Sequence, residues 1–272
     1  MVLYPLTDAE IPNGHSSATI PAWQAVEKKQ KQPARDWWLI AQPDHAALAG
    51  DLAANLNSPL FPQLDQHVIR AIALHDAGWA RFDGGERDTG HDLEIVLRDP
   101  QLDAQGRPLS FLEMTPEDFL RAWADSIIQA ERAAPIGGVM VSQHFCRLAA
   151  NRLQSRIDNP QDTHRLKQFL RGEAKRQEHL LEHGPRPPAE VRVLTDVLQF
   201  CDLLSLYLCC GARDAIEFPQ NFAGRTIRLR REREMHRLEP SIFGGGVSLG
   251  VTARHYPLFG AVEVIVLPLL LS

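Results

Sequence analysis

Apolar residues recur at helical spacing through most of the chain, which predicts a protein built mainly from helices. The first core helix is expected over Asp44–Asn55, with Asp44 as its N-terminal cap. The second is expected over Leu64–Ala77, where valine and isoleucine repeat along one side. We expect Gly78 to end this second helix, as a glycine just past the last turn commonly does.

Four further helices follow from the same periodicity. Thr115 and Pro116 with two following acids are typical of a helix start, because the threonine caps the helix and the acids lie at the positive end of its dipole. The most charged of the four is expected to be exposed, and the last, almost wholly apolar, is expected at the centre. Their ranges are 115–134, 136–153, 161–183 and 191–210.

Alternation of apolar and polar residues replaces the helical period near the C-terminus. Strands are expected over Thr226–Arg230, Val247–Ala253 and Ala261–Leu267. Residues 1–35 are polar and mixed, and Trp37–Ile40 is either a strand or the approach to the first helix. The predicted fold is mostly α, a helical bundle over 1–212 (core about 40–212) with a small antiparallel β appendage over 213–272.

Composition narrows the classes of partner and compartment. A net charge of −5 gives no sign of a nucleic-acid polymer as partner. The four cysteines form no Cys-x-x-Cys pair, which favours free thiols in a reducing compartment. No signal peptide is visible, and the apolar run 258–271 is shorter than the ~20 residues of a membrane helix. We therefore expect a cytoplasmic protein that does not contact a membrane.

The dipeptide His75-Asp76 is the most informative polar feature, because it lies at the end of an apolar helical run. A buried carboxylate is costly unless it is paired or binds a metal. His45, His144 and Asp202 also lie in mostly apolar helical patterns. Each alone has an ordinary explanation, as a capping or core histidine or as a carboxylate paired with a buried arginine or hydroxyl. Together they indicate a metal site between helices.

The order of these residues, His, then His-Asp, then Asp, resembles the HD-domain superfamily of metal-dependent phosphohydrolases. The resemblance covers roughly residues 40–212 and points to a branch apart from the well-studied members. It implies an HD-domain-like helical bundle and metal ligands at His45, His75, Asp76 and Asp202. His144 matches the extra histidine of some binuclear members, which also use further histidines. The candidates for those are His164, His179 and His183.

The expected function is a metal-dependent hydrolase of a phosphoester or nucleotide-like substrate, acting through a metal-activated water. Two imidazoles and two carboxylates suit one or two ions of Fe, Mn, Co, Ni or Zn. Asp76, Arg81 and Arg147 are the expected catalytic residues, the arginines as phosphate contacts beside the site; Arg87 is a further candidate. The loop over 79–114 starts directly after the His-Asp pair and is expected to cover the site.

Two alternatives stay open at this point. A di-iron oxygenase on the same scaffold would use His164 as a further ligand. A non-catalytic binding module with a structural metal would have a closed site. The expected partner of the hydrolase is a small phosphorylated molecule, and a homo-oligomer is left open.

Overall fold

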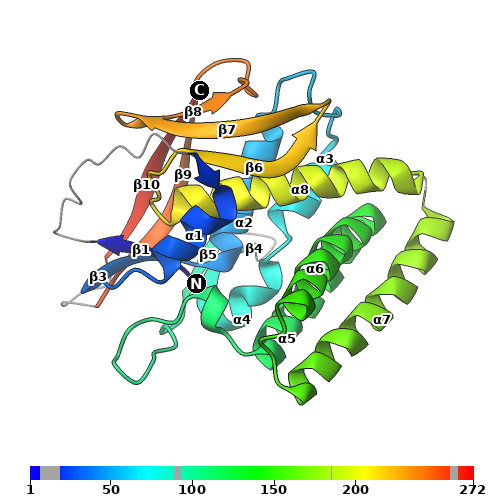
Figure 1. Ribbon diagram of the computed structural model, residues 1–272, viewed down its shortest axis with the longest axis horizontal. Helices are drawn as coiled ribbons and strands as arrows, with labels where there is room; N and C mark the ends of the chain where they lie inside the picture. Colours follow the sequence, from blue (N-terminus) through cyan, green and yellow to red (C-terminus); the bar gives the residue numbers. More distant parts are fainter. Residues whose placement is uncertain (7–18, 89–92, 185, 258–262) are drawn as a thin grey trace.

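The computed structural model describes residues 1–6, 19–88, 93–184, 186–257 and 263–272, without the side chains of 85–97. Among the described residues, eight strands form one mixed sheet in the order β1-β3-β9-β10-β8-β7-β6-β2. The sheet curls, and the long helices lie against its concave side and beyond it (Figure 1). A separate hairpin, β4-β5, contacts α2 and α4 through β4.

The helical elements account for most of the chain between the N-terminal and C-terminal strands. They are α1 (Ala22–Gln30), α2 (Gln42–Ala54), α3 (Gln66–Ala73), α4 (Ala80–Asp83), α5 (Pro116–Ala133), α6 (Pro135–Ser155), α7 (Pro160–His183) and α8 (Pro188–Cys209), with short 3-10 turns η1 (Ala77–Trp79) and η2 (Phe111–Glu113).

The strands come from both ends of the chain. They are β1 (Val2–Leu6), β2 (Ile20–Pro21), β3 (Asp36–Ile40), β4 (Gly84–Asp88), β5 (Leu93–Leu97), β6 (Ile216–Phe222), β7 (Arg225–Glu232), β8 (Met235–Glu239), β9 (Val247–Tyr256) and β10 (Val264–Leu271). β1 pairs with β3 from Val2 opposite Ile40 onward, and β3 pairs with β9. The N-terminal strands thereby extend the C-terminal sheet at one edge.

The expectation of a helical bundle with a small antiparallel appendage is therefore wrong, as is an all-α description of residues 1–212. The sheet is large, it takes strands from the N-terminus, and it is mixed, since β10 pairs with β8 and β2 with β6 in parallel. The pairing of β1 with β3, and of β3 with β9, joins segments far apart in sequence, and no local periodicity predicts such pairing. Burial in the sheet explains why apolar residues of β1 form a strand although local periodicity predicts no element there.

The helix expectations are confirmed for the longer segments. α5 begins after Thr115, whose side chain accepts a hydrogen bond from the Asp118 N–H. α6, α7 and α8 each begin with a proline and match their expected ranges within a few residues. α2 begins at Gln42, so Asp44 lies in its first turn and is not the cap.

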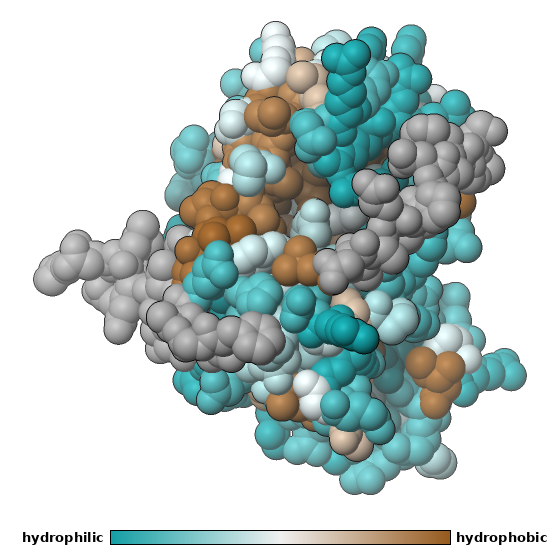
Figure 2. Space-filling model, turned by 90° about the vertical axis from the view of Figure 1, so that its left-hand side faces the viewer, coloured by the Kyte–Doolittle hydropathy of each residue, from teal (hydrophilic) through white to brown (hydrophobic). Residues whose placement is uncertain are grey.

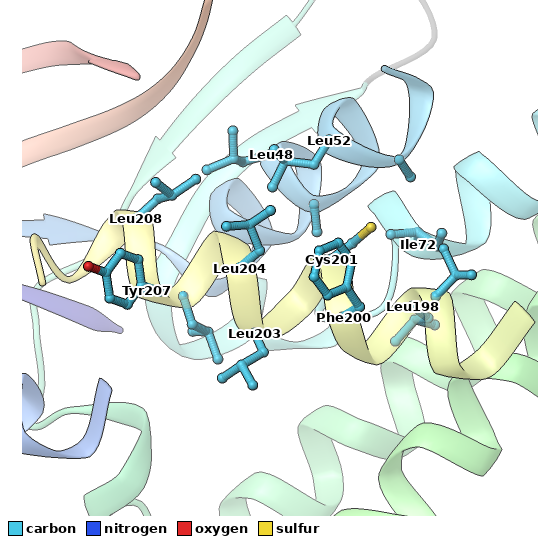
Figure 3. Packing of buried hydrophobic residues seen from close by; sticks show 14 of the residues in the cluster. Leu48, Leu52, Ile72, Leu198, Phe200, Cys201, Leu203, Leu204, Tyr207 and Leu208 are labelled. Carbon is cyan, nitrogen blue, oxygen red and sulfur yellow. The ribbon is translucent and has the colours of Figure 1, made fainter. Parts of the chain in front are cut away.

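Helix α8 is the centre of the core, as its apolar sequence predicts. It runs from the helical side into the curve of the sheet and contacts α1, α2, α6 and β6 (Figure 1). Leu204 and Leu208 of α8 lie toward Leu48 and Leu52 of α2 (Figure 3). One hydrophobic cluster includes side chains from both sides of residue 212, among them Val2, Leu204 and Leu271. The division of the chain near residue 212 stays a prediction.

The side of the molecule that holds β1 and β10 carries apolar surface beside polar surface (Figure 2). Alternate residues of β10 point outward, and Val266 is 66% exposed. In the part of the chain that the structure describes, no helix is both long and apolar enough to cross a membrane.

Candidate metal centre

Five residues singled out in the sequence lie together in the structure. His45 is on α2, His75 and Asp76 are in the turn after α3, His144 is on α6, and Asp202 is on α8. The first four are buried and Asp202 is half-buried. They form two overlapping groups of donor atoms that lie within 4.8 Å of one another, His45-His75-Asp76 and His75-His144-Asp202.

A glycine and a serine hold the turn that carries His75 and Asp76. A Cβ atom on Gly78 would lie 2.1 Å from the carbonyl oxygen of Ala122, so only glycine allows this turn to pack on α5. The Gly78 N–H donates to the Ser126 hydroxyl of α5 at 2.9 Å. The expectation that Gly78 ends the helix is wrong, because α3 ends at Ala73. The glycine serves a close approach between elements.

The protonated nitrogen of His45 is set by Ser205. Ser205 donates its hydroxyl hydrogen to the Asp202 carbonyl oxygen at 2.8 Å, so its oxygen accepts from His45 Nδ1 at 3.0 Å. In a neutral ring Nε2 then carries the lone pair. This Nε2 lies 2.9 Å from Asp76 Oδ2.

His75 is arranged in the same way. Its Nδ1 donates to the Ile72 carbonyl oxygen at 2.7 Å, and its Nε2 lies 3.2 Å from Asp202 Oδ1 and 3.8 Å from Asp76 Oδ2. Both imidazoles thus direct Nε2 at carboxylate oxygens. Two lone-pair donors facing each other repel, so each Nε2 requires either a proton or a shared cation.

The electrostatics of the metal-free site follow from these contacts. Burial disfavours the charged form of His75, but the Asp76 charge and the Asp202 hydrogen bond outweigh it and raise the pKa of His75 to about 9. Burial opposes ionisation of Asp202, yet the hydrogen bond and charge of His75 bring the pKa of Asp202 down to about 2. Burial lowers the pKa of His144 to about 4, so its ring is neutral near pH 7. Without a metal, a proton on His75 takes the place of a cation.

The donor set fits a divalent transition metal. Two donors bound to one ion at about 2.1 Å lie roughly 3 Å apart, close to the His45–Asp76 and His75–Asp202 separations of 2.9 and 3.2 Å. Asp76 Oδ1 is buried and has no hydrogen-bond partner among the described residues. The hydrogen bonds that Nδ1 of His45 and Nδ1 of His75 make are typical of imidazoles that bind a metal through Nε2. His144 Nε2, 3.7 Å from Asp202 Oδ2, can add a fifth donor.

The cluster is open to the surface through two neighbouring cavities. The first, of about 440 Å³, is lined by Asp76, His144 and Asp202 together with many aromatic and aliphatic side chains. The second, of about 540 Å³, shares His144 and Asp202, and polar side chains make up a larger share of its lining. Both volumes lie in the range of small-molecule sites. The cluster therefore lies where a ligand from solvent can reach it.

The two arginines expected beside the site differ in position. Arg147 lies one turn after His144, lines the second cavity and donates to Asp196 and Gln199. Arg81 is 47% exposed, pairs with Asp125 at 3.2 Å and lines neither cavity. Arg87 lies in β4, where side chains are outside the described part. The loop over 79–114 contains the β4-β5 hairpin and η2, and Trp79 and Phe111 from it line the first cavity.

The additional histidine candidates lie elsewhere. His164, His179 and His183 are all exposed on α7, and the structure does not bring them to the cluster.

Ser205 and the aromatic residues of α5 are functional candidates that the sequence did not reveal. Ser205 has a faint signal, because it lies three residues after Asp202 on a helix.

The fold and the site together define an α/β protein with a buried histidine–carboxylate cluster at the base of a cavity. The family described as "Protein of unknown function (DUF3891)" matches residues 30–256, and the chain belongs to this family. The matched range contains all five residues of the cluster. None of the curated proteins and none of the solved structures matches the chain.

Proposed function

We propose that this protein is a metal-dependent hydrolase of a small phosphoester. The observation that carries the proposal is the orientation of His45 and His75, whose Nδ1 atoms are held as donors while both Nε2 atoms face carboxylates. Buried carboxylates that face imidazole lone pairs are stabilised by a cation between them, which offsets the cost of removing the charges from water. The ordered resemblance to metal-dependent phosphohydrolases supports the same chemistry.

His45, His75, Asp76 and Asp202 would hold the ion, with His144 at one side. When bound, a divalent transition metal lowers the pKa of a coordinated water and offsets charge on a phosphoryl oxygen. The side chains supply the remaining requirements. The neutral His144 ring lines both cavities, and its Nε2 would either bind the ion or, where it does not, accept a proton from a reacting water.

Arg147 supports a phosphoester as substrate. Its guanidinium is held by Asp196 and Gln199 at the wall of the cavity that also exposes His144. Guanidinium groups bind phosphoryl oxygens through paired N–H donors. The cavity also argues against a closed structural site. The oxygenase alternative gains no support, because His164 is exposed on α7.

Metal analysis of purified protein tests the site. We expect bound transition metal in the wild type, its loss in Asp76→Asn, and its retention in His164→Ala, which removes an exposed histidine instead. Circular dichroism controls for folding. Full metal content in Asp76→Asn with an intact fold would refute the site.

Hydrolysis tests the activity. We expect turnover of p-nitrophenyl phosphate or its diester that is lost on chelation and restored by the metal found in the first experiment. Turnover that survives both chelation and Asp76→Asn would contradict the proposal.

A further inference from the structure

The cavity above the cluster has an aromatic wall. Phe119 and Trp123 of α5 and Phe145 of α6 line it, with Trp123 stacked on Phe145 at 4.8 Å and 13°. Phe111 and Trp23 continue this wall at an edge-to-face distance of 6.4 Å. Aromatic side chains placed around a cavity bind flat apolar groups through burial and ring contacts.

Large apolar side chains are also exposed where this cavity opens. Trp23 is 42% exposed and Ile157 is 70% exposed, and both line the cavity. They are among the most exposed large apolar side chains of the described residues. Exposed apolar groups around a concave site are typical of ligand-binding grooves.

Charge excludes an anionic group from this cavity. Arg152 is the cation among its described lining residues, and its Nε and Nη2 both donate to Asp158 at 2.7 to 3.1 Å. Arg147 of the second cavity differs, because it bonds Asp196 and Gln199 of the described residues through Nη1 alone. The Arg152 guanidinium also lies 4.9 Å from the centre of the Phe119 ring. Glu27 adds a further carboxylate to the lining, away from the metal-site candidates. An uncharged group therefore suits this cavity best.

Polar side chains make up a larger share of the lining of the second cavity, although Trp23, Leu148, Leu203 and Pro219 also line it. Beyond His144 and Asp202, its lining includes Arg147, Asn151 and Gln199 together with Gln220 and Asn221 of β6. These side chains offer N–H donors to oxygen atoms. His144 and Asp202 line both cavities, as do Trp23, Leu148 and Asn151, so these two metal-site candidates lie at the boundary.

We propose that the substrate is a phosphoester of a flat, uncharged aromatic alcohol, with its ring in the aromatic cavity and its phosphoryl oxygens toward Arg147. This inference rests on the proposed hydrolase function. The bond that is cleaved then lies at the boundary, beside the metal ligands. The assignment excludes sugar and glycerol phosphates as preferred substrates, because their hydroxyl groups would lose water against an apolar wall.

Binding of two phosphonates to metal-loaded protein, measured by calorimetry, tests the substrate class. Benzylphosphonate and methylphosphonate carry the same charge and are not hydrolysed, so their ratio of affinities reports on the ring alone. We expect benzylphosphonate to bind at least about tenfold more tightly, as burial of one ring provides. Adenosine monophosphate forms a second arm, because its phosphate is esterified to ribose and not to an aromatic alcohol. We expect it to bind more weakly than benzylphosphonate, and binding that is as tight would overturn the assignment to an aromatic alcohol.

Two matched variants locate the ring. Leu112 lines only the aromatic cavity and is half-buried, so Leu112→Trp should fill it and bring the ratio close to one. Val193 is exposed on α8 and lines neither cavity, so Val193→Trp should leave the ratio unchanged.

The outcomes separate the two proposals. Equal binding of both phosphonates that is lost in Asp76→Asn would keep the hydrolase and overturn the aromatic substrate. Benzylphosphonate binding that persists in Asp76→Asn would overturn the inference, because the compound would then bind through its ring alone, independently of the metal ligands. No binding of either compound to metal-loaded protein would overturn both.

Discussion

Replacing Ser205 with alanine should weaken metal binding without removing a metal ligand. Ser205 is fully buried, and its oxygen accepts the hydrogen bond from His45 Nδ1 that leaves Nε2 turned to Asp76. In Ser205→Ala the buried Nδ1–H has no acceptor at this position. The His45 ring then loses the contact that fixes its tautomer and orientation.

The magnitude follows from the lost hydrogen bond. Leaving one buried donor unpaired costs about 1–3 kcal/mol of folding free energy. Loss of the residue that hydrogen-bonds a ligating histidine typically lowers metal affinity about 10- to 100-fold, which is about 1.4–2.8 kcal/mol. Metal titration against a competing chelator measures the affinity, and thermal unfolding of metal-free protein measures the folding term.

Ser142→Ala is the matched control. Ser142 is also fully buried and accepts a hydrogen bond from Gln177 of α7 at 2.8 Å, but it bonds none of the five cluster residues. We expect a similar loss of stability with nearly unchanged metal affinity. Equal metal affinities of Ser205→Ala and Ser142→Ala would refute the assignment of Ser205 as the partner that orients His45.

Three further predictions use other parts of the structure. Gly78→Ala should lower the unfolding free energy by about 3 kcal/mol or more, because its Cβ would overlap the Ala122 carbonyl oxygen, whereas the exposed Gly172→Ala on α7 should raise it by about 0.5–1 kcal/mol in denaturant titrations. Burial and the nearby Arg231 guanidinium of β7 lower the pKa of His236 to about 4, so below about pH 6.5 the unfolded chain takes up a proton that the folded chain does not. The free energy of unfolding should therefore drop by about 1–3 kcal/mol toward pH 4, and His236→Phe should make this drop smaller. Arg147→Gln should raise KM for a phosphoester about tenfold and leave metal content unchanged; a lost metal would show a structural role instead.

The helices could be predicted from the sequence because their information is local. The Thr115 cap and the proline at the start of α6 each act within one turn, so α5 and α6 follow from a few adjacent residues. The sheet could not be predicted in the same way. β1 is a short apolar run that contains Pro5, and its residues pair with residues of β3 that lie 30 to 38 positions further along the chain, at Asp36–Ile40. Only the assembled core makes that pairing favourable.

The candidate site likewise has a part that could be predicted from the sequence and a part that could not. His45, His75, Asp76, His144 and Asp202 could be selected because ionisable groups are rare inside apolar helical patterns. Their surroundings depend on packing between elements distant in sequence. Ser205 meets His45 across α8 and α2, and Trp123 of α5 meets Phe145 of α6. Arg81 shows the limit of sequence proximity, since it lies five residues after Asp76 yet pairs with Asp125 on the surface.

The two overlapping donor groups predict about one tightly bound ion per chain. Both groups contain His75, whose Nδ1 is occupied by the Ile72 carbonyl oxygen, so only Nε2 can bind metal. One nitrogen lone pair serves one ion, and a second ion would have His144 as its only remaining imidazole of the cluster, beside carboxylate oxygens of Asp76 and Asp202. We therefore expect His45→Ala to lose the metal and His144→Ala to keep it with about tenfold weaker affinity, measured by elemental analysis and chelator competition. Two tightly bound equivalents in the wild type, with one remaining in His144→Ala, would show a binuclear centre and contradict the sharing of His75.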